Sequence, residues 1–223
     1  MISRQLARTA LPILTLGATF LMPQAHAQTV AYNNFGSGNS FSNSSGWDLE
    51  TFGATSFGFT FTPSVSGTLT GIDVAIGYFG GVNGGVQVLL STSPSFPTLP
   101  SSIAPPSPLE TWTLSGALPT WNTNFAPQAL ASVNKPSLSA GTVYFIYAKT
   151  LVGGSWNRWQ FNTTGDVAPS IRSNNNSTYG LDSIIGIAPK GAFRVTVTPA
   201  PEPATLGLLA LGSFMLVRRR KTT

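Results

Sequence analysis

The chain has no cysteine and only one histidine, His26, among its 223 residues. The absence of cysteine excludes a disulfide framework, thiolate metal sites and a cysteine nucleophile. His26 lies in a segment that we expect to be removed, so the mature protein would contain neither residue. It would therefore lack two of the side chains that most often act as nucleophile or general base in enzymes.

Charge is also scarce in the body of the chain. The formal net charge is +5 and the pI is about 9.9, values that would ordinarily point to nucleic acid or an anionic membrane as a partner. However, between residues 28 and 200 six basic residues balance six acidic ones, and the excess lies at the two ends. A neutral body cannot neutralise many phosphates, so we expect no nucleic-acid partner.

The N-terminal residues 1–27 have the pattern of a secretory signal peptide. Arg4 and Arg8 form a positively charged start, and residues 10–22 form an apolar stretch that is too short for an ordinary spanning helix. An uncleaved membrane anchor is the alternative interpretation.

Small residues mark the expected cleavage site. Pro23 interrupts the apolar helix, and Ala25 and Ala27 stand at positions −3 and −1 for signal peptidase. We predict that cleavage leaves Gln28 as the new N-terminus, outside the inner membrane.

The C-terminus consists of three elements in a fixed order. Pro201, Glu202 and Pro203 are followed by the largely apolar residues 204–217, which would make a helix of about 21 Å, shorter than a bilayer core of about 30 Å. Such a helix spans a membrane only marginally. The chain then closes with a basic cluster that favours a cytoplasmic end, formed by Arg218, Arg219, Arg220 and Lys221.

This order resembles the PEP-CTERM protein-sorting signal of Gram-negative bacteria. The resemblance implies recognition by exosortase, a membrane-embedded transpeptidase-like protein, and removal of the tail as the protein leaves the cell. It also implies an association with extracellular polysaccharide and biofilm, and it makes Glu202 a recognition residue. The alternative is a plain C-terminal anchor. We therefore divide the chain into a signal peptide, a body at 28–198 and a sorting signal at 199–223.

The body has the pattern of an all-β, antiparallel β-sandwich, jelly-roll-like in its strand number and turns. Apolar and other residues alternate with period two at 57–61, 72–78 and 193–197, as in strands with one buried face. Two further runs are apolar on both faces and predict strands covered on two sides. These runs are 86–90 and 143–148, and additional strands are expected at 109–114 and 156–161.

The connections contain turn residues. Residues 80–85 include an Asn-Gly pair and predict a tight hairpin. The proline-rich segment 91–109 predicts a long loop, and 173–177 a polar turn. The body, at 57–63 and 67–72, also resembles the domains called choice-of-anchor domains, which brings no known chemistry.

Motifs of enzymes are weak in this sequence. Ser132 and Lys135 have the Ser-x-x-Lys spacing of serine β-lactamases, but Pro136 disfavours the helix that this motif needs. Asp48 and Glu50 would share one strand face at about 6–7 Å, which leaves a carboxylate-dependent hydrolase as the weakest hypothesis. We expect no enzyme activity, no cofactor and no metal site, although a calcium ion held by backbone carbonyls would leave no sequence pattern.

The aromatic residues suggest a second hypothesis, a carbohydrate-binding module. Strand alternation places Trp156, Arg158 and Gln160 on one face and Trp159 on the other. We expect Trp159 in the core and the first three residues in a glycan contact. The leading hypothesis remains a non-enzymatic exported protein of the cell surface or matrix, with exopolysaccharide as a possible partner.

Overall fold

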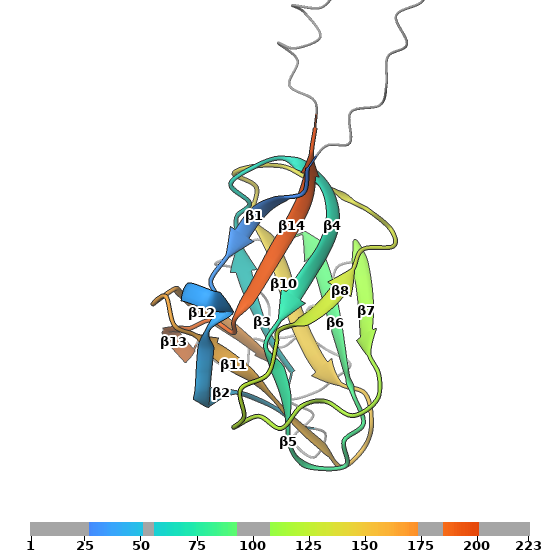
Figure 1. The fold of residues 1–223 in the computed structure, drawn as a ribbon, viewed down its shortest axis with the longest axis vertical. Helices are drawn as coiled ribbons and strands as arrows, with labels where there is room; N and C mark the ends of the chain where they lie inside the picture. Colours follow the sequence, from blue (N-terminus) through green and yellow to red (C-terminus); the bar gives the residue numbers. More distant parts are fainter. Residues whose placement is uncertain (1–26, 51–55, 93–107, 174–184, 201–223) are drawn as a thin grey trace, which may run out of the picture.

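The described residues of the computed structural model are 27–50, 56–92, 108–173 and 185–200, and they fold into β-strands with one short 3-10 helix, η1 (Figure 1). All pairings between neighbouring strands are antiparallel, which confirms the predicted all-β fold class. The bounds are β1 Thr29–Asn33, η1 Ser37–Asn39, β2 Phe41–Glu50, β3 Ser56–Phe61, β4 Gly67–Val74, β5 Ile76–Gly81, β6 Val86–Thr92, β7 Glu110–Leu114, β8 Gln128–Ala131, β9 Ser137–Leu138, β10 Tyr144–Thr150, β11 Ser155–Asn162, β12 Val167–Ser173, β13 Ile185–Pro189 and β14 Phe193–Pro199.

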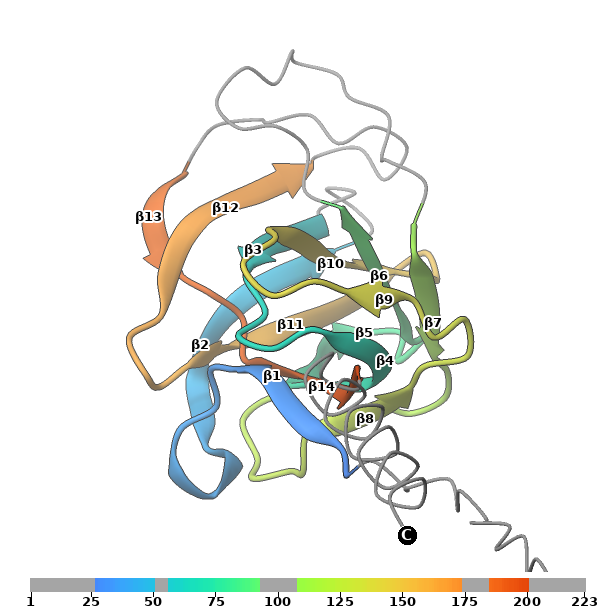
Figure 2. The same ribbon diagram turned by 90° about the horizontal axis from the view of Figure 1, so that it is seen from above.

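The strands form three sheets. A five-stranded sheet has the order β1-β14-β4-β8, with β9 also paired to β4, and a six-stranded sheet has the order β13-β12-β3-β10-β6-β7. These two sheets are the layers of the sandwich (Figure 2). The third sheet, β2-β11-β5, lies toward the end of the domain opposite to the start of β1 and the end of β14 (Figure 1).

Aromatic rings join the two main sheets. Phe193, Val195 and Val197 of β14 are fully buried, as their alternation predicts. The ring centroids of Phe61 and Phe193 lie 5.6 Å apart, and the ring of Tyr32 stacks on Phe193 at 4.7 Å. Because each buried aromatic or aliphatic side chain contributes about 1.5–3 kcal/mol, this layer is a principal source of stability.

Trp159 of β11 links the third sheet to the same core. Its side chain is fully buried, which confirms the predicted core position. The indole packs edge-on against Phe59 at 5.1 Å and its Nε1 donates a hydrogen bond to the carbonyl of Ala192 at 3.0 Å. A side chain at Gly191 would collide with the indole, so glycine is required there.

Strands β6 and β10 are buried on both faces, as their continuous apolar runs predict. β10 pairs with β3 on one side and β6 on the other. On the face of β3 that lies away from Phe59, Gly58 makes room for Phe145, because a Cβ at Gly58 would lie 2.2 Å from the Phe145 ring.

Two local predictions are wrong. The run 72–78 is not one strand, because it breaks at Ala75, whose N–H donates to Ala192 while its carbonyl accepts from Gln160. The chain thereby passes from the five-stranded sheet in β4 to the third sheet in β5. Residues 80–85 form no hairpin, since β5 and β6 belong to different sheets. Most of the predicted loop 91–109 and of the turn 173–177 lies outside the described residues.

Candidate functional site

Strand β11 is the centre of the third sheet and carries the predicted glycan-contact residues. Trp156 lies opposite Glu50 of β2 and Gly80 of β5, and Arg158 lies opposite Asp48. Directly opposed residues of antiparallel strands project to the same side of a sheet. The outer face of β2-β11-β5 therefore gathers Trp156, Arg158, Asp48 and Glu50.

Two further aromatic residues complete this face. Phe79, from β5, packs against Trp156 with ring centroids 4.5 Å apart, and Trp121, from the segment between β7 and β8, lies 5.0 Å from Phe79. Trp156 is 38% exposed, while Phe79 and Trp121 are half-buried. We call Phe79, Trp121, Trp156 and Arg158 the aromatic site.

The guanidinium of Arg158 holds the site together. Its Cζ lies 3.9 Å from the Phe79 ring centroid and 4.4 Å from that of Trp121, so the cation contacts both rings. Its Nε donates to the Asp48 carboxylate at 2.5 Å, and the Arg158 side chain is only 14% exposed. A planar cation fixed by a carboxylate and two rings is strongly preorganised.

Gln160 has a supporting role instead of the predicted contact. Its side chain is fully buried, and its Nε2 donates to the backbone carbonyl of Trp121 at 2.7 Å. The backbone N–H of Trp121 donates to Tyr78 at 2.9 Å, and that of Tyr78 donates to Pro119 at 2.7 Å. Gln160 and Tyr78 thus fix Trp121 beside β5, although it lies in no strand of the third sheet.

Two glycines keep this face open. A Cβ at Gly46 would lie 2.7 Å from Cγ of Arg158, and one at Gly77 would lie 2.9 Å from Cα of Trp121. Any larger residue at these positions would displace the arginine or the tryptophan. The aromatic site consequently depends on glycines of β2 and β5 that leave room for Arg158 and Trp121.

One of the two carboxylates on this face is engaged by the arginine. Asp48 and Glu50 share a face, as predicted, but Asp48 is held in the ion pair with Arg158. With one arginine and two carboxylates, the formal charge of the face is −1. Across the part of the chain that the structure describes, no three His, Cys, Asp or Glu side chains gather into a possible metal site.

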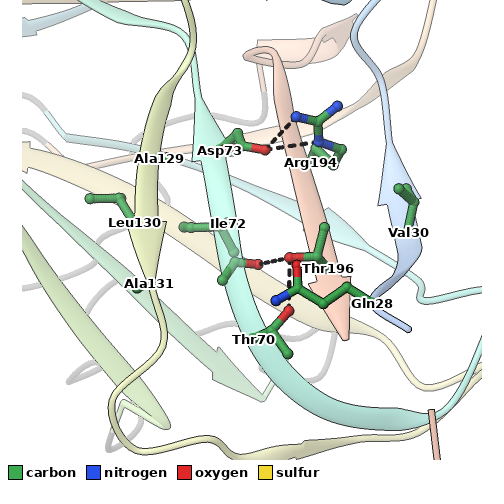
Figure 3. Close-up of a pocket in the computed structure, with 11 residues that line it drawn as sticks. Gln28, Val30, Thr70, Ile72, Asp73, Ala129, Leu130, Ala131, Arg194 and Thr196 are labelled. Carbon is green, nitrogen blue, oxygen red and sulfur yellow. Dashed lines mark hydrogen bonds and ion pairs between the residues drawn. The ribbon is translucent and has the colours of Figure 1, made fainter. Parts of the chain in front are cut away.

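A separate groove lies on the outer face of the five-stranded sheet. This groove has a volume of about 390 Å³ and includes Gln28, the predicted mature N-terminus (Figure 3). Its polar groups are paired with one another: Arg194 contacts Asp73 at 2.7 Å, and Thr70 bonds Thr196 at 3.0 Å. These groups already satisfy each other, and no aromatic ring is among the described residues that line the groove, so it lacks the ring surface that the aromatic site has.

The Ser132-x-x-Lys135 segment is a turn and not a helix. The hydroxyl of Ser132 donates to the buried carboxylate of Glu110 at 2.7 Å, and it accepts from the backbone N–H of Lys135 at 3.0 Å. Ser132 therefore has a structural partner, and the turn does not reproduce the helical turn on which the β-lactamase motif depends.

The comparison with known proteins concerns the C-terminal tail. Residues 199–221 match the PEP-CTERM protein-sorting motif, which confirms the resemblance seen in the sequence. The motif supports an exported protein of Gram-negative type that is sorted by exosortase. No curated protein matches the chain.

The residues of the sorting signal are not among those that the structure describes. Pro201, Glu202, Pro203, the apolar segment 204–217 and the basic cluster all lie in 201–223, and the signal peptide falls within 1–26 except for Ala27. Of the helices formed by described residues, none has the length and apolar character needed to cross a membrane.

Sequence reasoning identified only part of the aromatic site. Strand alternation placed Trp156 and Arg158 on one face, and the structure brings them together. Phe79 and Trp121 were missed because their approach depends on the pairing of β5 with β11 and on a loop contact. The sequence feature that could have indicated this contact is the pair of glycines at 46 and 77, which lie opposite residues of β11 and leave room for larger side chains.

Proposed function

We propose that this protein is a non-enzymatic component of the cell surface or extracellular matrix, exported across the inner membrane and sorted by exosortase. The observation that carries this proposal is the PEP-CTERM motif at residues 199–221. Signal peptidase removes residues 1–27, exosortase removes the tail, and the neutral domain is delivered into the exopolysaccharide or biofilm layer.

The position of the chain ends supports this route. Thr29, in the first strand, pairs with Val197, in the last, so both ends of the domain leave from one side (Figure 1). The aromatic site belongs to the sheet at the other end. While the tail is in the membrane, this arrangement directs the aromatic site away from the bilayer.

The composition of the body suits a wet matrix. Its balanced charge avoids the non-specific attraction that a large net charge would cause in a layer of charged polymers.

The test replaces Pro201, Glu202 and Pro203 by alanine and follows the protein by cell fractionation. We expect the triple variant to remain in the inner-membrane fraction with its tail attached, because exosortase no longer recognises it. Thr205→Ala, within the apolar segment, is the matched control and should be exported like the wild type. Export and processing of the triple variant at the wild-type level would contradict the proposal.

A further inference from the structure

We propose that the aromatic site binds a neutral polysaccharide, with a pyranose ring stacked on Trp156. This inference goes beyond the sorting function and rests on the outer face of β2-β11-β5 alone. Failure of glycan binding would leave the sorting proposal intact, and failure of sorting would leave the binding site intact.

The apolar part of the site has the chemistry that recognises a sugar ring. The axial C–H groups on one face of a pyranose are apolar and weakly positive, and they pack on the electron-rich face of an aromatic ring. Trp156 presents 38% of its surface to solvent, and Phe79 and Trp121 continue the apolar surface at centroid spacings of 4.5 and 5.0 Å. Arg158 lies over the faces of Phe79 and Trp121, so Trp156 is the ring on which a sugar stacks and the other two extend the apolar surface beside it.

The polar part of the site can orient hydroxyl groups. The Asp48 side chain is 35% exposed and can accept hydrogen bonds from hydroxyl groups, whereas Arg158, at 14%, is held by Asp48 and two rings. Glu50 lies opposite Trp156, so the two side chains project to the same side of the sheet. Acceptors beside an exposed ring are polar groups of the kind that give a mostly apolar site its specificity.

The charge of the site selects among polymers. Asp48 and Glu50 outnumber Arg158, and the arginine is already compensated by the ion pair at 2.5 Å. A uronate, sulfate or phosphate next to this face would meet net repulsion and no uncompensated cation. The same argument disfavours single-stranded nucleic acid, which also stacks on aromatic rings but depends on basic residues for its phosphates.

The site is rigid before any ligand arrives. Arg158 is clamped between two rings, Gln160 fixes Trp121 at 2.7 Å, and the strand pairing of β11 fixes Trp156. A preorganised site loses little conformational entropy on binding.

The experiment is affinity electrophoresis of the exported protein through gels that contain one polymer each. The neutral probes are dextran, laminarin and hydroxyethyl cellulose, and the anionic probes are alginate and single-stranded DNA. We expect retardation by at least one neutral polymer and by neither anionic one. Trp156→Ala should weaken the binding about tenfold, which corresponds to about 1.4 kcal/mol, and Trp156→Phe should restore most of it.

Two variants serve as controls. Val133→Ala removes a side chain that is 81% exposed and lies in the turn after β8, so its retardation should equal that of the wild type. Ile187→Ala removes a side chain that is 77% exposed and lies in β13 of the six-stranded sheet, so it should also bind like the wild type. The proposal is overturned if no neutral polymer retards the protein, if Trp156→Ala binds as well as Val133→Ala, or if binding is confined to alginate or DNA.

Discussion

The buried carboxylate of Glu110 provides a stringent test of how this fold is stabilised. Glu110, the first residue of β7, is 2% exposed and accepts hydrogen bonds from the turn that follows β8. The donors are the hydroxyl of Ser132 at 2.7 Å and the backbone N–H groups of Val133 at 3.0 Å and Asn134 at 3.1 Å. Successive N–H groups that converge on one anion form a nest.

The expected magnitude follows from these contacts. Glu110→Ala would leave three donors without their acceptor, and each unsatisfied buried donor costs about 1–3 kcal/mol. Because the turn is partly accessible to water, we expect the free energy of unfolding to fall by about 3 kcal/mol. Glu110→Gln retains one oxygen and the side-chain volume, so its cost should be about 1–2 kcal/mol.

The assay is guanidinium unfolding of the purified protein followed by tryptophan fluorescence. Trp112 lies two residues from Glu110 in β7 and bonds the carbonyl of Ala131 at 2.8 Å, so it reports on this region. Glu50→Ala, at a half-buried glutamate, is the control and should change stability by less than about 0.5 kcal/mol. A loss below 1 kcal/mol for Glu110→Ala, or equal losses for the alanine and glutamine variants, would refute the reasoning.

Three other predictions test separate parts of the domain. Gly141→Ala should lower the free energy of unfolding by about 1 kcal/mol, because the backbone φ at Gly141 is +76° although a Cβ there would meet no other atom. Gly153 is equally open but has no positive φ, so Gly153→Ala should leave the stability unchanged. Equal effects of the two variants in thermal or chemical unfolding would contradict this. Asn162→Asp should lower the free energy of unfolding by roughly 2–3 kcal/mol. Nδ2 of Asn162 donates to two backbone carbonyls at 2.7 and 2.9 Å, and a carboxylate in its place would repel both. Unchanged stability of this variant would contradict the prediction. Burial, followed by the hydrogen bond to Asp166, raises the pKa of Tyr32 well above its usual value of about 10, so folding retains the phenol proton. The wild type should therefore lose stability as the pH rises above about 10, and Tyr32→Phe should lose less in unfolding experiments across that range; identical pH profiles would count against this account.

The period-two pattern was sufficient to predict individual strands but not their sheets. Alternation located β3 and β14, and continuous apolar runs located β6 and β10. Burial of one or both faces of a strand determines which of its own residues are apolar, so the pattern can be seen within each segment of the sequence. The break at Ala75 has no such local cause. It arises from hydrogen bonds to Ala192 and Gln160, which are distant in the sequence.

The candidate site shows the same limit. Alternation correctly grouped Trp156 with Arg158, but it assigned Gln160 to the exposed surface, whereas the segment of Trp121 covers that position. The tail was readable from the sequence because a sorting signal is a linear motif. A binding face assembled from β2, β5, β11 and a loop depends on register, which only the folded structure supplies.

The most direct test of the central claim is intact and peptide mass spectrometry of the protein isolated from the exported and membrane fractions of cells with and without exosortase. We predict an N-terminus at Gln28 in both strains, and loss of Arg218–Thr223 only where exosortase is present. Exported protein that retains Arg218–Thr223 in both strains would contradict processing by exosortase and leave a plain membrane anchor.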